Sequence, residues 1–132
     1  MRHAKAVAWE EQLKQVFDSI DHQLEEEYGA RYSLHPSRKQ RGSTSNPEAD
    51  GLFNVGAVFT PGFGSQHGPG YVVEVQMATL SRVADEVREE IEERVVALLR
   101  EGLKTAFPGR ALDVSRDGGV YKIHGDLKLG SV

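Results

Sequence analysis

Residues 52–78 read LFNVGAVFTPGFGSQHGPGYVVEVQMA, two strand-like segments on either side of a glycine-rich stretch. In 71–78 apolar and polar side chains alternate, which is the period-two pattern of a strand with one buried face and one wetter face. In 52–60 one face collects apolar side chains at every second position: Phe53, Val55, Ala57 and Phe59. The region therefore predicts two strands that form a hairpin with a long connection.

Helical patterns flank this hairpin on both sides. Apolar residues over 6–28 recur at steps of three and four, which predicts an amphipathic helix ended by Gly29 in the left-handed conformation. A second apolar stripe over 80–106 predicts a second helix, with Ser81 as its N-cap. Pro108 disfavours helical geometry at the residue before it, so this helix is expected to end there.

A second hairpin is predicted near the end of the chain. Segments 111–116 and 119–125 carry strand patterns, and the turn signal Asp117-Gly118 lies between them. That turn places Asp113 opposite Lys122, so that opposite charges face each other across the two strands. A turn one residue later would lose this charge pair, and we therefore expect the first register.

Together these elements predict a single α+β domain over residues 1–132, with the element order α-β-β-α-β-β. We expect a four-stranded, mostly antiparallel sheet with both helices on one face. Among the possible strand orders we favour one in which strand 52–60 lies between strands 71–78 and 111–116. Every neighbouring pair in that order would be antiparallel.

Composition excludes several classes of protein. The chain has 132 residues, a net charge of −4 and no cysteine, which excludes disulfides, thiolate metal sites and cysteine nucleophiles. No apolar run approaches the ~20 residues of a membrane span, and the N-terminal residues contain no apolar signal core. We therefore expect a cytoplasmic protein that does not bind membranes, and the acidic balance argues against nucleic acid as a partner.

The segment at 30–50 shows neither the helical nor the strand period of apolar residues, and its charge is opposite in sign to that of the rest of the chain. From Tyr28 to Pro47 there are four basic residues and no acidic one, so this window carries +4 and the rest of the chain −8. Guanidinium forks and hydroxyl groups are suited to binding phosphates and carboxylates. The residues expected to bind an anionic ligand or an acidic partner are His35, Arg38, Lys39, Arg41, Ser45 and Asn46. Two alternatives are that the loop is solvated and mobile, or that it neutralises Glu25–Glu27 at the negative end of the first helix.

The connection at 61–70 is the second unusual loop. Six of the fourteen glycines lie between residues 51 and 70. Glycines let backbone N–H groups turn toward an anion, and an exposed aromatic side chain at a hairpin tip is a common interface anchor. The residues expected to close over a ligand or a second subunit are Gly62, Phe63, Gly64, Ser65 and His67. The alternative is a connection that is merely flexible.

Known catalytic motifs are absent from the sequence. The dinucleotide fingerprint fails because His67 occupies the position of its third glycine. No phosphate-binding P-loop, nucleophile elbow or His-Glu-x-x-His zinc motif is present either. The sequence therefore predicts no metal, and it identifies no catalytic residues and no cofactor.

Three functional hypotheses stay open. The first is a small binding or interaction module that forms a homodimer and uses the two loops as its site. The second is a small enzyme for a phosphorylated or acyl substrate, in which His35 or His67 is the general base and Asp50 orients it. The third is an RNA-binding surface that combines the basic residues of 31–41 with an aromatic side chain.

Overall fold

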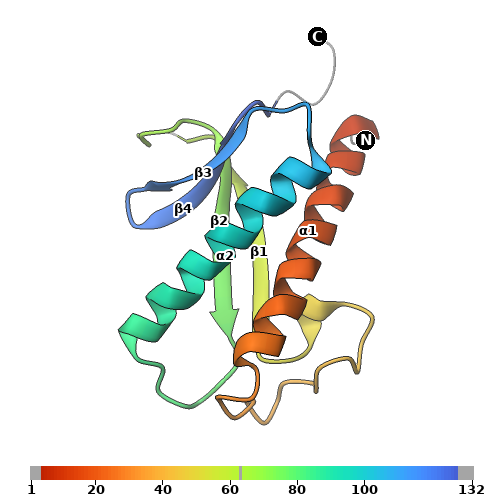
Figure 1. Cartoon of the computed structure of the whole chain (residues 1–132), viewed down its shortest axis with the longest axis vertical. Coiled ribbons are helices and arrows are strands. Elements are labelled where there is room, and N and C mark those ends of the chain that lie inside the picture. The colour runs from red at the N-terminus through yellow and green to blue at the C-terminus, as the bar shows by residue number, and fades with distance from the viewer. Residues whose placement is uncertain (1–3, 63, 128–132) are drawn as a thin grey trace.

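The computed structural model describes residues 4–62 and 64–127 (Figure 1). Its elements are α1 (Ala4–Tyr28), the short 3-10 helix η1 (Pro47–Ala49), β1 (Phe53–Thr60), β2 (Gly70–Met77), α2 (Asp85–Ala106), β3 (Leu112–Asp117) and β4 (Val120–Gly125). The four strands form one antiparallel sheet, and both helices lie on the same face of it. The predicted α+β fold and its order of helices and strands are therefore confirmed.

The order of strands across the sheet is β1-β2-β4-β3, so the predicted interior position of β1 is wrong. β1 lies at an edge and pairs with β2 over its whole length. β4 takes an interior position because it pairs with β2 on one side and with β3 on the other. It is also buried on both faces: Ile123 is 0% exposed beneath the helices, and Lys122 is 2% exposed on the other face. β2 and β4 approach closely at Gly70, where an added Cβ would overlap the carbonyl oxygen of Ile123.

The β3–β4 hairpin differs from the predicted register. Its two-residue turn is Gly118-Gly119, one residue later than expected, so the predicted pairing of Asp113 with Lys122 is wrong. The observed register pairs Val114 with Ile123, both of which are fully buried. It also keeps Asp117 within the strand, where its carboxylate reaches the ammonium group of Lys122 at 2.7 Å. Burial of the apolar pair and of this ion pair outweighs a charge pair at the surface.

The core lies between the helices and the sheet, as the two apolar stripes predict. The buried apolar residues of α1 are Trp9, Leu13, Val16, Phe17, Ile20, Leu24 and Tyr28, and those of α2 are Ile91, Val95, Val96, Leu99 and Leu103. The helices pack closely at Gly102, where an added Cβ would lie 2.7 Å from Cγ1 of Val16. Within the described part of the chain, neither helix combines the length and the apolar character that crossing a bilayer requires.

Two predicted helix ends are wrong in detail. Gly29 follows α1 without a positive φ, and its lack of a side chain serves close packing, because an added Cβ would lie 2.7 Å from Oε2 of Glu25. α2 begins at Asp85, and its N-cap residue is Ala84, which makes no side-chain capping bond. Ser81 instead lies in the preceding turn, where its N–H donates to Oγ1 of Thr79 at 3.0 Å.

Candidate functional site

The basic loop, residues 31–50, is fastened to the start of β1 by Arg38. The Arg38 guanidinium donates hydrogen bonds to three backbone carbonyl oxygens, those of Asp50 (3.0 Å), Gly51 (3.0 Å) and Phe53 (3.2 Å). The N–H of Gly51 in turn donates to the carbonyl oxygen of Lys39 at 2.9 Å. Arg38 therefore points into the protein and satisfies carbonyl groups where the sheet begins.

Arg41 lies against the acidic end of α1. Its guanidinium forms an ion pair with Glu26 at 3.0 Å and lies 3.1 Å from Nδ1 of His22. This contact is the neutralisation of the helix end that the sequence offered as an alternative to ligand binding. The side chains of Lys39 and Ser45 are exposed.

The last two predicted anion-binding residues also make contacts within the chain. Oδ1 of Asn46 accepts a hydrogen bond from the Lys14 ammonium at 3.1 Å. Nδ1 of His35 accepts one from the N–H of Ser37 at 3.0 Å. The structure therefore does not direct the six predicted residues toward one common cleft. Binding of an anion by the basic loop stays a prediction, and the contacts favour a structural role.

We expect Arg38→Ala to destabilise the fold even without an anion present. Hydrogen bonds to charged groups contribute roughly 1.5–3 kcal/mol each, and water replaces part of what is lost, so we expect the free energy of unfolding to fall by about 2–4 kcal/mol. Urea unfolding in an anion-poor buffer measures the change, with the exposed Arg82→Ala as the matched control. Unchanged stability of Arg38→Ala would show that other contacts hold the loop.

Three buried carboxyl groups lie between α1 and this loop: Asp21, Glu25 and Asp50. Oε1 of Glu25 accepts a hydrogen bond from the N–H of Phe53 at 3.0 Å. Oδ2 of Asp50 accepts two from Thr44, one from its N–H (3.1 Å) and one from its hydroxyl (2.8 Å). Burial opposes the ionisation of Asp50, but these hydrogen bonds outweigh it and lower its pKa.

Asp21 differs from the other two carboxyl groups because its Oδ2 atom has no hydrogen-bond partner among the described residues. The side chain is 3% exposed. Burial, followed by the nearby charge of Glu25, raises the pKa of Asp21 to about 8, so it holds a proton at neutral pH. Sequence reasoning missed this group, although its position beside Ile20 and Leu24 on the apolar stripe was a usable signal. Among the described residues, no three acidic or histidine groups are arranged to hold a metal ion.

The glycine loop, residues 61–70, folds back over the sheet face opposite the helices. There the buried ammonium group of Lys122 contacts Asp117 Oδ2 (2.7 Å), Ser65 Oγ (2.9 Å) and the Gly68 carbonyl oxygen (2.7 Å). These partners use all three protons that an ammonium group can donate. We call this arrangement the Lys122 cluster.

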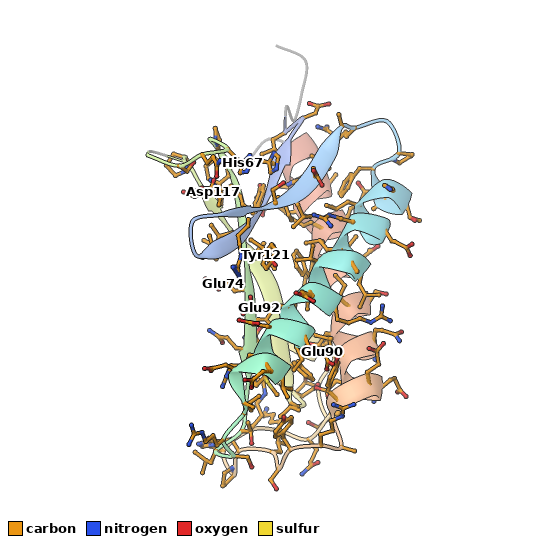
Figure 2. The ribbon with its side chains drawn as sticks, turned by 60° about the vertical axis from the view of Figure 1, so that its left-hand side comes forward. His67, Glu74, Glu90, Glu92, Asp117 and Tyr121 are labelled. Atoms are coloured by element: carbon orange, nitrogen blue, oxygen red, sulfur yellow. The ribbon has the colours of Figure 1, made fainter. Side chains whose placement is uncertain are left out.

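Asp117 completes the connection between the glycine loop and the β3–β4 hairpin. Its two carboxylate oxygens accept hydrogen bonds from the N–H of Gln66 (3.0 Å) and of His67 (3.1 Å). Figure 2 shows His67 next to Asp117 at this end of the sheet. The hydrogen bond from Lys122, together with those from the loop backbone, holds the pKa of Asp117 well below its usual range.

The glycines of this loop meet steric demands of the chain itself. Gly62 has φ +79°, and a Cβ there would overlap the carbonyl oxygen of Gly68. Gly64 also has a positive φ, of +73°. The Ser65 hydroxyl donates to the Gly62 carbonyl oxygen at 2.8 Å. Phe63, the predicted interface anchor, lies outside the described residues.

The histidines named in the enzyme hypothesis are separated. His67 stacks on His124 with ring centroids 4.3 Å apart, and Nε2 of His124 lies 2.9 Å from Oγ of Ser115. Burial and the neighbouring His67 lower the pKa of His124. His35 and Asp50 belong to the basic loop at the other end of β1, a strand of eight residues that spans roughly 26 Å. The structure therefore does not bring His67 and Asp50 into one site, and Nδ1 of His35 contacts the N–H and the hydroxyl of Ser37.

A hollow of about 580 Å³ runs between α1 and the edge strand β1. Its apolar walls include Leu13 and Phe17 from α1, Ala57 and Phe59 from β1, and Tyr71 from β2. Phe59 is 55% exposed, and its ring packs edge-on against Tyr71 with centroids 5.5 Å apart. Sequence reasoning missed this site because it placed β1 inside the sheet, where no edge would be open.

Comparisons with known proteins match almost the whole chain. A family model described as "Uncharacterised protein" matches residues 4–125. A protein of Borreliella burgdorferi (strain ATCC 35210 / DSM 4680 / CIP 102532 / B31), described as "Uncharacterized protein", is 42% identical over 125 residues, which are 95% of this chain and 98% of that protein. The comparison with solved structures gave no match.

Proposed function

The chain belongs to the family whose model matches residues 4–125, and we propose that it is a protein-interaction module that works as a homodimer joined along β1. The observation that carries the proposal is the open edge of β1, residues 54–60. It lies next to a hollow with apolar walls and with the charged residues Glu10, Glu11 and Lys14 of α1 in its lining. Unpaired strand edges are templates for pairing with another chain, and natural proteins leave them unprotected mainly where pairing is used.

The direction of the backbone groups on β1 follows from three contacts. The Leu52 carbonyl oxygen accepts a hydrogen bond from the N–H of Ala78, the residue after β2, so this carbonyl group faces β2. The carbonyl oxygen of Phe53, the next residue, accepts a hydrogen bond from Arg38, and the N–H of Phe53 donates one to Glu25. Both backbone groups of Phe53 therefore face the open side of β1. Because direction alternates along a strand, the N–H and C=O groups of Val55, Ala57 and Phe59 also face the open side.

This edge lacks the devices that usually prevent pairing. Residues 54–60 contain no charge and no proline, and Val58 (54%) and Phe59 (55%) are among the most exposed large apolar side chains. β3, at the opposite edge of the sheet, carries three charged residues in six: Asp113, Arg116 and Asp117. The two edges therefore differ in the way expected if only β1 pairs with another chain.

A second copy of β1 fits this edge in one register. With Ala57 opposite its own copy, Val55 lies opposite Phe59, and three pairs that each exchange two bonds give about six hydrogen bonds. The same register brings Phe53, whose N–H and C=O are occupied, opposite Pro61, which has no N–H to offer. The ladder of hydrogen bonds therefore ends at the pair of Phe53 and Pro61, because neither residue has an N–H free to donate. This match favours a second copy of the chain as the partner.

We expect Phe59→Lys to convert a dimer into a monomer, because a charge would enter the apolar centre of the interface. Leu80→Lys is the matched control: Leu80 is 75% exposed and lies outside β1, so this variant should stay dimeric. Analytical ultracentrifugation gives the dissociation constant, which we expect Phe59→Lys to raise about tenfold or more, or ~1.4 kcal/mol.

A second variant separates the interface from folding. Ala57→Pro removes an N–H that faces the open side and makes no bond within the sheet, so the monomer should keep its melting temperature while the dimer is lost. A parent chain that sediments as a monomer at high micromolar concentration contradicts the proposal. Equal dissociation constants for Phe59→Lys and Leu80→Lys contradict it as well.

The other hypotheses stay predictions: the anionic ligand, the enzyme, the RNA-binding surface and the cytoplasmic location. The contacts described above give the two loops internal partners, and the open edge of β1 is the feature that these partners leave unsatisfied. The interaction module is therefore the hypothesis that the geometry supports best.

A further inference from the structure

The sheet opens between β2 and β4, on the side away from β1. β2 pairs with β4 at only two positions, Tyr71 with Ile123 and Val72 with Lys122, whereas it pairs with β1 over eight. Beyond these pairs the β3–β4 hairpin diverges from β2 and leaves a hollow of about 310 Å³. Residues from β2, from α2 and from the tip of the hairpin line it. Figure 2 shows Glu74, Glu92 and Tyr121, one from each of these elements, around the opening. We call this hollow the seam groove.

The seam groove has an apolar floor and acidic walls. Val73, Val75, Val95 and Val96 form the floor, and Val120 at the rim is 41% exposed. Glu74 and Glu92 line the groove itself. Glu89 and Glu93 line an adjoining hollow of about 230 Å³, together with Glu92, Arg116 and Tyr121.

The charges of the groove are not balanced from within. Over the described residues, none of the four glutamates takes part in an ion pair, while glutamates elsewhere, such as Glu26 and Glu27, do. Two basic residues lie nearby: Arg116 lies over the Tyr121 ring at 5.0 Å, and Arg88 lines a small third hollow with Val75 and Glu92, so four glutamates face two arginines. The local excess of negative charge favours a positively charged occupant.

The groove also offers backbone groups. The N–H of Ala78 faces β1, because it donates to the Leu52 carbonyl oxygen. Backbone groups of successive strand residues face alternate sides, so the N–H and C=O of Val75 face away from β1. The pairing with β4 stops at Val72, so within residues 4–62 and 64–127 no strand pairs with Val75 on that side. An extended segment placed along β2 could therefore exchange two hydrogen bonds with Val75, in the manner of strand addition.

We propose that the seam groove binds an extended segment of a partner protein that carries a lysine. The segment pairs with Val75. A lysine on the face of the valine floor lays its methylene chain over that floor and reaches Glu92, and a lysine on the other face of the sheet reaches Glu74. This site is distinct from the homodimer interface, because β1 and the groove lie on opposite sides of β2. A homodimer would therefore present two such grooves.

The test uses a short peptide as the probe. Fluorescence anisotropy measures the binding of a labelled Val-Lys-Val-Lys-Val peptide to the full chain, with Val-Glu-Val-Glu-Val as the comparison peptide. We expect the first to bind, the second not to bind, and the double variant Glu74→Gln/Glu92→Gln to bind the first about tenfold more weakly. Glu101→Gln, at an exposed glutamate of α2 outside the groove, is the matched control and should bind like the parent chain.

Two further measurements locate the peptide. Hydrogen exchange followed by NMR should show slower exchange of the Val75 amide when the lysine peptide is added. Val120→Lys, which adds a positive charge at the rim, should also weaken binding about tenfold. The proposal is overturned if the lysine peptide does not bind, if both peptides bind equally, or if the double variant binds as tightly as the parent chain. Protection of Ala57 in place of Val75 would also overturn it, because the peptide would then occupy the β1 edge.

Discussion

Replacing Lys122 with methionine is expected to unfold part of the protein and destabilise the rest. Lys122 is 2% exposed, and its ammonium group donates to three partners, two of them in the glycine loop. Removal of one partner of a buried ion pair typically lowers the free energy of unfolding by roughly 3–5 kcal/mol, and we expect a value in this range. The loss should appear first in the glycine loop, because Lys122 connects that loop to β4.

Urea unfolding measures the overall loss, and amide hydrogen exchange of Gln66 and His67 reports on the loop. Lys104→Met, at an exposed lysine of α2, is the matched control and should change stability little. The double variant Lys122→Met/Asp117→Leu tests the cause. It removes the unpaired carboxylate but leaves the N–H groups of Gln66 and His67 without an acceptor. We therefore expect partial recovery of stability and no recovery of loop protection. Full recovery of both would show that the loop is not held by Asp117.

The second large effect concerns the dependence of stability on pH. The folded pKa of Asp21 is about 8, against 3.8 for the ordinary group. Between these values the folded state binds a proton that the unfolded state has released, so stability falls as pH rises from about 4 to about 8. At ~1.4 kcal/mol for each pKa unit, this cost is on the order of 5 kcal/mol at pH 8.

We therefore expect Asp21→Asn to be more stable than the parent chain at pH 8 by several kcal/mol, with a gap that shrinks steadily toward pH 4. Urea unfolding of both proteins at a series of pH values measures this gap. Titrating groups that do not interact with Asp21, such as His124, act on both proteins alike and cancel in the difference. Gln15→Asn, at an exposed position of α1, removes no titrating group and should give a gap that does not change with pH. A constant gap for Asp21→Asn would mean that Asp21 ionises normally in the fold.

The two loops show how far local patterns could predict the site. Charge segregation in 31–50 and the glycines of 61–70 correctly marked both loops as unusual, because neither pattern suits a regular element. The signals were ambiguous between a ligand and an internal partner. Arg38 satisfies backbone carbonyls and the glycine loop surrounds Lys122, and both partners are distant in the chain. Only the fold decides which distant groups meet.

The sequence by itself determined which segments are helices and strands and which side of each is buried. Periodicity is a local property. Apolar residues at steps of three and four fit a helix with one buried side, and apolar residues at every second position fit a strand with one buried face. The tertiary structure decided the strand order, the register of the β3–β4 hairpin and the open edge of β1. These depend on how the strands pack against each other and against the helices. Burial of the pair Val114 and Ile123 outweighs the surface charge pair that the turn signal suggests, and Gly70 lets β2 approach β4 closely at Ile123.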